Sequence, residues 1–236
     1  MSSTFPLDHL VFATPDLART VEEVAELTGV RPVEGGSHPG LGTRNYLLGT
    51  GNGGYLEIVG PDEGQPAPDG PRWFGIDALT GPRLVHWAVR VPDIDARVAG
   101  ARERGYDPGE PVAMARATPE GGTISWRLTM PLPHGHDRGG DGLVPFLLDW
   151  GTTVHPSERG LPVLPLLAFT ARHPEPDRVA DELAALGAGL EIFRGTVPAL
   201  TAVLDGRHGP VTFGDGITSA DATTPPHGHE RGVTTS

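Results

Sequence analysis

Apolar and polar positions follow one pattern at two places along the chain. The segments "LDHLVFATPDL" (7–17) and "LVHWAVRVPDI" (84–94) each have a His, an apolar run, and Pro-Asp six and seven residues after the His. Alternation within the first run places His9, Val11 and Ala13 on one face of a predicted strand. The chain therefore repeats one structural unit, and each copy begins with a strand that carries a His.

A helix is predicted after each Pro-Asp pair. In the first copy, apolar residues recur at intervals of three and four between Leu17 and Thr28, which is the spacing of one helical face. Thr14 is the predicted N-cap, Pro15 takes the first helical position, and Gly29 provides the C-terminal stop. Because the second copy repeats this spacing, both copies read as a strand followed by a helix.

Short alternating segments after each helix predict further strands. They are "GTRNYLLGTG" (42–51) and "GYLEIVG" (54–60) in the first copy, and "TISWRLTM" (123–130) and "PFLLDWG" (145–151) in the second. Another strand near residue 32 completes the first copy. The sequence thus predicts βαβββ modules at residues 6–60 and 83–160, with the Pro- and Gly-rich residues 61–82 between them as a linker.

A third, degenerate βαββ unit is predicted at residues 161–214. Leu166–Ala171 is typical of a strand and Asp177–Leu186 of a helix, and short apolar segments follow. This unit keeps a Pro before its helix but has no His six residues earlier. Residues 215–236 are polar and rich in Gly, Pro and Thr, which predicts a disordered tail.

The composition of the chain excludes several classes of binding partner and of chemistry. The chain has 236 residues, a formal net charge of −12 and no cysteine. An acidic chain lacks the basic surface that attracts nucleic acid or anionic lipid, so we expect neither as a partner. Disulfides and thiol catalysis are excluded. Neither a signal peptide nor an apolar run of membrane-spanning length is visible, so we expect a cytoplasmic protein.

A repeated βαβββ plan, with a His on the first strand and an acid on the last, resembles the vicinal oxygen chelate superfamily. A narrower resemblance, to its glyoxalase-like domain family, is carried by "LDHLVFATPDL" (7–17), "SHPGLGTRNYLLGTGNGGYLEIVG" (37–60) and "PFLLDWGTTVHP" (145–156). The resemblance implies an α+β fold of the glyoxalase/bleomycin-resistance/dioxygenase type. In that fold the modules pair into a cup-shaped mixed β-sheet with the helices outside.

The resemblance also implies a metal centre inside the cup. In metal-dependent members, the first-strand His and last-strand acid of both modules bind one divalent ion, and these positions match His9, Glu57 and His86, with Asp149 as the nearest acid for the fourth. Glu57 lies three residues before a Gly and Asp149 only two, so a one-residue shift would put Leu148 opposite Glu57. Imidazole and carboxylate suit Zn, Fe, Mn, Ni or Co. Glu57, Asp149 or metal-bound water would then move a proton at the substrate carbon.

The segment "SHPGLGTRN" (37–45) is a predicted substrate-binding element. The resembling family carries a similar run beside the cup, which implies that His38, Thr43 and Asn45 bind substrate and that Arg44 meets an anionic group. An exposed hairpin connection is the alternative interpretation, because loops of this composition also serve only as connections.

Three weaker candidates complete the predicted site. His155 would line the rim of the cup. Strand alternation puts either Trp126 or Arg127 toward the cup, and Arg127 could bind a carboxylate with both nitrogens. The loop "PHGHDRGGDG" (133–142) places two His and an Asp close together, but a mobile loop explains its glycines equally well.

Two functions remain open from the sequence. The first is a divalent-metal-dependent lyase, isomerase or dioxygenase acting on a small oxygen-rich molecule in the cup. The second is a metal-free, antibiotic-type binding protein on the same fold. The third unit could cover the open edge of the cup in place of a dimer partner, so either a monomer or a homodimer is expected.

Overall fold

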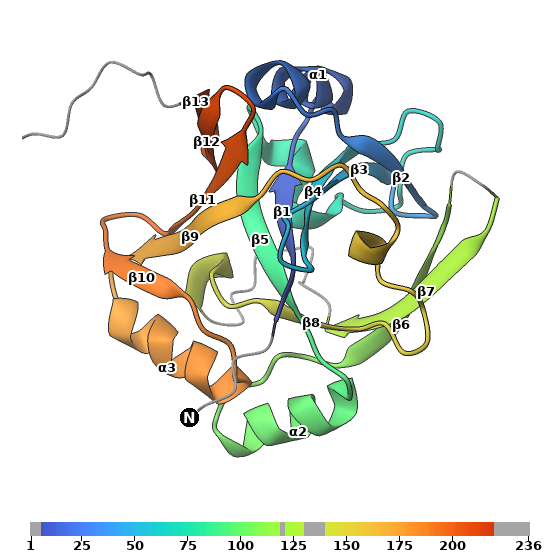
Figure 1. The fold of residues 1–236 in the computed structure, drawn as a ribbon. Helices are drawn as coiled ribbons and strands as arrows, with labels where there is room; N and C mark the ends of the chain where they lie inside the picture. Colours follow the sequence, from blue (N-terminus) through green and yellow to red (C-terminus); the bar gives the residue numbers. More distant parts are fainter. Residues whose placement is uncertain (1–5, 119–120, 130–139, 220–236) are drawn as a thin grey trace, which may run out of the picture.

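The structure is a computed structural model of the chain, and it describes residues 6–118, 121–129 and 140–219. Two consecutive βαβββ modules make up its larger part, as predicted (Figure 1). The first contains β1 (Leu7–Ala13), α1 (Leu17–Thr28), β2 (Val33–His38), β3 (Thr43–Gly49) and β4 (Tyr55–Pro61). The second contains β5 (Arg83–Arg90), α2 (Ile94–Glu103), β6 (Pro111–Ala117), β7 (Thr123–Thr129) and β8 (Phe146–Asp149).

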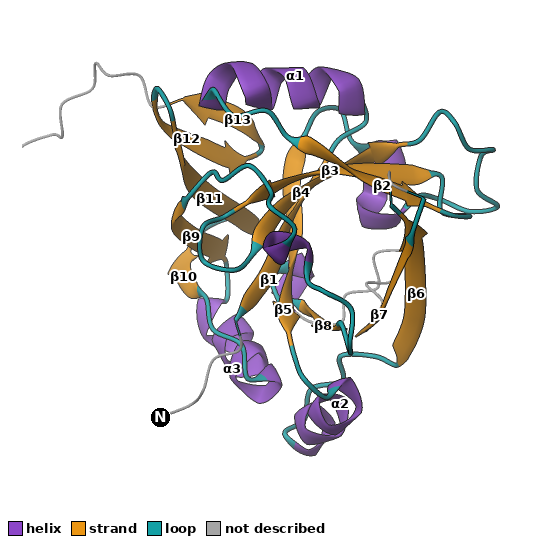
Figure 2. Cartoon of the chain, turned by 45° about the vertical axis from the view of Figure 1, so that its right-hand side comes forward, coloured by secondary structure: helices purple, strands orange, loops and turns teal. Residues whose placement is uncertain are grey.

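The strands of the two modules build one eight-stranded mixed sheet. Its strand order is β2-β3-β4-β1-β5-β8-β7-β6, and the two modules meet where β1 pairs antiparallel with β5. Within each module the first strand runs parallel to the last, β1 beside β4 and β5 beside β8. The end strands β2 and β6 also contact each other, so the sheet curls into a nearly closed cup (Figure 2). This confirms the predicted fold class.

Side-chain caps fix where the module helices begin. Asp16, and not the predicted Thr14, is the N-cap of α1, and its carboxylate accepts from the Arg19 N–H at 3.1 Å. The Thr14 hydroxyl instead lies 2.7 Å from that of Thr20. Asp93 caps α2 in the same way as Asp16 caps α1, so the Pro-Asp pair of each module supplies the cap.

The predicted linker also contributes to the inside of the cup. Within residues 61–82, the short 3₁₀ helix η1 (Trp73–Ala78) packs its Ile76 side chain against the inner face of the sheet, where it is buried. Trp73 and Phe74 lie beside it. The linker prediction was therefore wrong for this stretch, because aromatic residues in a Gly- and Pro-rich context gave no periodic signal.

The third unit forms a second sheet of its own. It comprises β9 (Leu166–His173), α3 (Pro176–Leu186), β10 (Glu191–Arg194), β11 (Ala199–Gly206), β12 (Gly209–Gly214) and β13 (Gly216–Ser219). The strand order is β10-β9-β11-β12-β13, with β9 parallel to β10. In the modules the parallel partner of the first strand is the last strand, whereas here it is the strand directly after the helix. The described residues have four strands after the helix where two were predicted, and the pairing differs from that of the modules.

Strand β13 also corrects the predicted start of the tail. Residues 216–219 pair antiparallel with β12, although the tail was predicted to begin at residue 215. The remainder of that segment, residues 220–236, lies outside the described residues.

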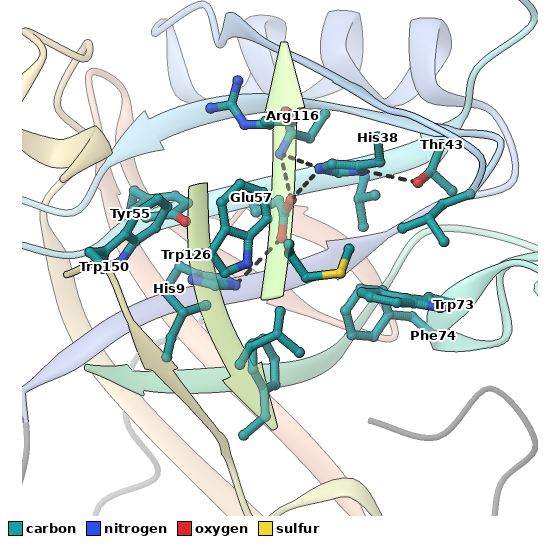
Figure 3. Close-up of a pocket in the computed structure, with 17 residues that line it drawn as sticks. His9, His38, Thr43, Tyr55, Glu57, Trp73, Phe74, Arg116, Trp126 and Trp150 are labelled. Carbon is teal, nitrogen blue, oxygen red and sulfur yellow. Dashed lines mark hydrogen bonds and ion pairs between the residues drawn. The ribbon is translucent and has the colours of Figure 1, made fainter. Parts of the chain in front are cut away.

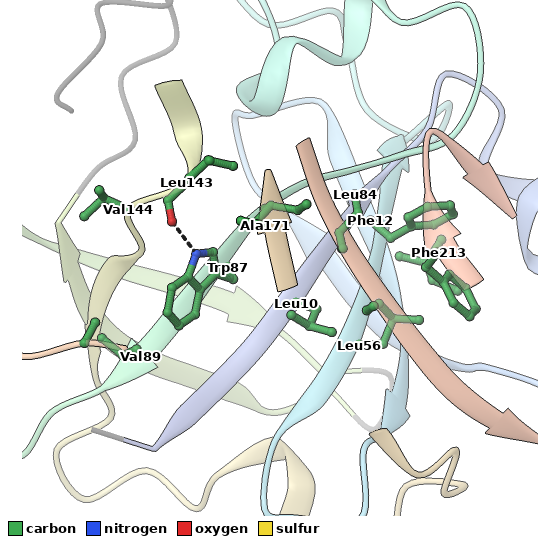
Figure 4. Close-up of a cluster of buried hydrophobic side chains, with 14 of the residues drawn as sticks. Leu10, Phe12, Leu56, Leu84, Trp87, Val89, Leu143, Val144, Ala171 and Phe213 are labelled. Carbon is green, nitrogen blue, oxygen red and sulfur yellow. Dashed lines mark hydrogen bonds between the residues drawn. The ribbon is translucent and has the colours of Figure 1, made fainter. Parts of the chain in front are cut away.

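Strand β1 has a buried face on each side. Leu10 and Phe12 point to the outer face of the cup and pack under the second sheet, where the rings of Phe12 and Phe213 lie 5.2 Å apart (Figure 4). Val11 and Ala13 point to the inner face. The strand therefore joins the main hydrophobic core to the interior of the cup. Within the described residues, no helix is long and apolar enough to cross a bilayer.

Candidate active site

A cavity occupies the interior of the cup. Its open space, mouth included, measures about 660 Å³. One part of the wall is polar, and the rest is mostly aromatic (Figure 3). The polar part comes from strands β1, β3 and β4 of the first module and from the end of β2, and it includes His9, His38, Thr43, Asn45, Tyr55 and Glu57. The aromatic part includes Trp73, Phe74, Trp126, Phe146 and Trp150.

Glu57 is the carboxylate of this polar wall. Strand β4 lies between β1 and β3, with Glu57 beside Val11 on one side and Leu47 on the other, so its side chain points into the cup. It is 8 % exposed. The Asn45 amide donates to Oε1 at 2.5 Å, and His9 Nε2 lies 3.5 Å from Oε2. Both carboxylate oxygens are thus held at defined positions at the cavity wall.

Asn45 has room for its side chain because Gly35 has none. A Cβ atom at residue 35 would lie 2.3 Å from Asn45 Oδ1, which is far below contact distance. His38 completes this side of the site: its Nδ1 lies 3.0 Å from the Thr43 hydroxyl, and its Nε2 lies 3.8 Å from Glu57 Oε1. The predicted residues His38, Thr43 and Asn45 therefore all line the cavity beside Glu57.

His9 is oriented from behind by its neighbour Asp8. The His9 Nδ1–H donates to Asp8 Oδ1 at 2.7 Å, which leaves Nε2 facing Glu57. The pairing of β1 with β5 shifts register between Leu7 and His9, so Asp8 sits at an irregularity of the strand. This irregularity allows two successive side chains, which would ordinarily diverge, to meet.

Asp8 is the centre of a buried network that the sequence did not reveal. It is fully buried, and Oδ2 accepts from the Trp150 indole N–H at 2.8 Å and from His155 Nε2–H at 3.1 Å. The Ser157 N–H donates to His155 Nδ1, which fixes the tautomer of that ring. His155 is itself buried behind the cavity wall and does not line the cavity, contrary to the prediction that it would bind substrate at the rim.

Burial and pairing shift the pKa values of this network in opposite directions. Burial acts to raise the pKa of Asp8, but hydrogen bonds from His155 and His9 outweigh it and hold the pKa well below its usual range. For His9, burial acts to lower the pKa, while the hydrogen bond and charge of Asp8 and the charge of Glu57 raise it overall. Burial lowers the pKa of His38. Asp8 is therefore an anion that favours the protonated form of His9.

His86 reaches the inner face of the cup but stands apart from this group. It pairs with Val11 in register, so it shares the face of His9 as predicted. The Phe146 ring contacts both imidazoles, with ring centroids 5.4 Å from His9 and 5.3 Å from His86. The Trp87 N–H donates to His86 Nδ1 at 3.0 Å. Burial lowers the pKa of His86 to about 4, so the ring is neutral at neutral pH.

Asp149 points away from the cavity, so its predicted roles as metal ligand and catalytic acid were wrong. Its carboxylate accepts from the Gly151 N–H at 2.9 Å and from the Ile94 N–H, at the start of α2, at 3.3 Å. Leu148 takes the inner position and lines the cavity. The one-residue difference in spacing before the Gly had left Leu148 and Asp149 as alternatives for this position, and the structure selects Leu148.

Both arginines predicted to bind substrate lie outside the cup. Arg44 alternates with the cavity residues of β3 and pairs with Glu34, while Arg127 binds Asp95 with both nitrogens at 2.5 and 2.8 Å. Trp126, the neighbour of Arg127, faces the cavity instead. Arg116 of β6 lines the cavity and was not predicted, because β6 itself gave no clear periodic signal. The predicted cluster of His134, His136 and Asp137 lies outside the described residues.

The predicted metal centre does not fit these positions. Among the residues that the structure describes, no three His, Asp or Glu side chains are placed to hold one ion. Leu148 takes the fourth corner, and His86 is separated from Glu57 and His9 by its contact with Phe146. We therefore derive no chemical step through a metal.

Comparison with known proteins identifies the family. A model of the glyoxalase-like domain matches residues 7–187. The chain belongs to the glyoxalase-like domain family. This places it in the vicinal oxygen chelate superfamily, whose members commonly bind divalent metals. The match includes both modules and the start of the third unit, and it ends just after α3. No curated protein matches the chain.

Of three similar solved structures, the first supports the fold. A hypothetical protein from Staphylococcus aureus, 14 % identical, superposes with a TM-score of 0.63 and covers 81 % of this chain and 87 % of that one. Methylmalonyl-CoA epimerase from Mycobacterium tuberculosis is 22 % identical over 63 % of this chain and 90 % of that one, with a TM-score of 0.40. A methylmalonyl-CoA epimerase in complex with methylmalonyl-CoA is 21 % identical over 65 % of this chain and 100 % of that one, also with a TM-score of 0.40.

Proposed function

We propose that this glyoxalase-like protein is an enzyme of the lyase or isomerase type that moves a proton on a small carbonyl compound held in the cup. The observation that carries the proposal is the position of Glu57. It is a buried carboxylate at the wall of an aromatic cavity, with one oxygen held by Asn45 and the other facing His9. A positioned carboxylate of this kind is suited to general acid–base catalysis.

In the proposed step, Glu57 removes a proton from the carbon next to the substrate carbonyl. The C–H bond breaks, the proton goes to the carboxylate, the electron pair of that bond forms a C=C bond, and the π pair of the carbonyl moves to its oxygen to give an enolate. Delivery of the proton to a different carbon completes an isomerisation, while loss of a leaving group from the carbon beyond completes an elimination. Asn45 keeps Oε1 oriented, and the aromatic wall excludes water from the reacting carbon.

His9 is the positioning partner of Glu57 in this mechanism. Its pKa is raised by Asp8 and Glu57 despite burial, so the protonated ring is favoured beside the carboxylate. The protonated ring presents its Nε2–H to Glu57 Oε2 at 3.5 Å, which helps to hold that oxygen in place. Asp8 fixes the direction of the ring and is itself held by Trp150 and His155.

Deuterium exchange into simple ketones tests the proposal and does not require the natural substrate. Acetophenone, propiophenone and 2-acetylnaphthalene are incubated with the protein in D₂O, and loss of the signal from the hydrogens next to the carbonyl is followed by NMR. The protein should accelerate exchange with at least one ketone, and E57Q should lower that rate about 100-fold or more. E26Q, which changes an exposed carboxylate on α1, is the matched control. Folded protein that exchanges none of the ketones, or E57Q that retains the full rate, would sink the proposal.

A metal-free binding protein is the second candidate function. Its support is the aromatic wall together with the lack of a three-ligand metal cluster among the described residues. In that case the ketones bind without exchange, and E57Q leaves their affinity unchanged. A divalent-metal-dependent reaction, which the family relationship favours, would be indicated if EDTA abolished exchange and Zn, Ni, Mn or Fe(II) restored it.

A further inference from the structure

The indole N–H of Trp126 is an unused hydrogen-bond donor in the cavity wall. Trp126 lies on β7, its ring lines the cavity, and its Nε1 atom is buried with no hydrogen-bond partner among the described residues. The other two buried indoles are satisfied: Trp87 donates to the Leu143 carbonyl at 2.7 Å and Trp150 to Asp8 at 2.8 Å. Because buried donors are normally paired, the exception calls for a partner outside the described residues, and the cavity offers a bound ligand that place.

The location of Trp126 in the cavity indicates the chemistry of its missing hydrogen-bond partner. Trp126 lines the same cavity as Glu57 and His9 (Figure 3), and its ring centroid lies 5.4 Å from that of Trp150. An indole N–H can only donate, so the missing group is an acceptor. A ligand carboxylate beside Glu57 would place two negative charges together, whereas a neutral carbonyl oxygen avoids that repulsion.

We infer that Trp126 is the donor for the carbonyl oxygen of the substrate, and that the substrate is a neutral, planar aromatic ketone with a C–H bond on the carbon next to its carbonyl. The aromatic body fits between the rings of Trp73, Phe74 and Trp150, which form the wall on either side. This inference rests on the proposed role of Glu57. With the oxygen at Trp126, the neighbouring C–H faces Glu57, and the indole N–H stabilises the enolate oxygen as negative charge develops there.

Indole N–H resonances of uniformly ¹⁵N-labelled protein test the inference directly. The chain has four Trp residues, and the resonance that is missing in W126F identifies Trp126. Titration with acetophenone or 2-acetylnaphthalene should move this resonance downfield. Ethylbenzene and 2-ethylnaphthalene, which have the same rings without an acceptor, should produce no downfield shift.

Affinities from the same titrations provide the second readout. W126F should weaken ketone binding about fivefold to tenfold, the usual effect of one lost hydrogen bond, and change hydrocarbon binding less than twofold. W73F, a matched change in the same wall that leaves the Trp126 donor in place, should weaken both classes alike. Should W126F fail to fold, the Trp126 resonance is assigned from through-bond and NOE spectra of the wild-type protein, and its shift still decides the matter.

The outcomes separate this inference from the proposed function. A downfield shift without deuterium exchange would overturn the role of Glu57 and keep that of Trp126. Exchange without the shift would overturn the role of Trp126 alone. An equal loss of ketone and hydrocarbon affinity in W126F, no binding of any ketone, or preferred binding of phenyltrimethylammonium with no downfield shift would each overturn the inference.

Discussion

At the scale of single residues, the site depends on a glycine without a side chain and on a local irregularity of strand β1. Asn45 reaches Glu57 only because Gly35 leaves its Oδ1 free space, and Asp8 reaches His9 only because strand β1 is irregular at that point. Each of these positions lies within a strand, and strand formation alone does not require Gly or Asp there. The neighbouring side chain requires that residue, so the requirement is visible in the structure and not in the pattern of apolar and polar residues.

The substitution G35A should therefore disturb the site. The new methyl group would lie 2.3 Å from Asn45 Oδ1 and 3.0 Å from the Leu47 side chain, so the amide must move away from Glu57. We expect a loss of about 1–3 kcal/mol in the free energy of unfolding, as for other overpacked sites. The side-chain amide resonance of Asn45 should shift as well. G70A is the control, since a Cβ there meets nothing within 4 Å; equal effects of the two changes would contradict the account.

His86 should make the fold sensitive to acid. Its folded-state pKa of about 4 lies below the ordinary 6.5, so between these values the unfolded chain binds more protons and stability falls as the pH is lowered. Between pH 7 and pH 4.5 this one group should remove about 2 kcal/mol from the free energy of unfolding. Urea unfolding of H86F at both pH values should show a correspondingly smaller difference. H208Q, at an exposed histidine, should retain the wild-type difference.

At the scale of elements, strand register decides which predicted residues reach the cavity. The repeat of a His and a Pro-Asp pair was enough to predict both modules, and alternation placed His9, His86 and Glu57 on the inner face. The same reasoning could not choose between Leu148 and Asp149, because one residue of shift in a four-residue strand reverses the answer. The walls supplied by η1 and β6 were not predicted, since those segments have no clear period.

The position of Asp149 predicts a structural role at the start of α2. Removing its carboxylate in D149A leaves the Ile94 and Gly151 N–H groups without this acceptor, and should cost about 1–2 kcal/mol in the free energy of unfolding. Ketone affinity should stay within twofold of wild type. L148A, the neighbouring change on the inner face, should alter ketone affinity. Loss of binding in D149A alone would mean that the carboxylate does face the cavity.

At the scale of the whole molecule, the eight-stranded sheet has the cavity on one face and the main hydrophobic core on the other. Its inner face encloses the cavity, and its outer face is covered by the second sheet, which lies beside it in Figure 1. The third unit was predicted as a cover for the open edge of the cup, but it packs on the outer face of the strands around β1. The third unit has no His at the position that matches His9 and His86, and no residue of the second sheet lines the described cavity.

The contact between Phe12 and Phe213 should therefore contribute to the stability of the fold and have no effect on ligand affinity. F213A removes a fully buried ring and should lower the free energy of unfolding by about 3–5 kcal/mol. A double-mutant cycle with F12A should give a coupling of about 0.5–1.5 kcal/mol for the ring pair. F193A, at a ring that is 48 % exposed, should change stability by less than about 0.5 kcal/mol. Ketone affinity of folded F213A should match that of the wild type.

The order of the two sheets along the chain has a consequence for synthesis on the ribosome. Leu10, Phe12 and Leu84 belong to strands that emerge early, while the second sheet that covers them ends only at β13. Translating the roughly 130 residues between the end of β5 and the end of β13 takes on the order of ten seconds. For that interval the nascent chain presents an uncovered apolar surface, so the speed of translation sets how long a chaperone or a neighbouring nascent chain can reach it.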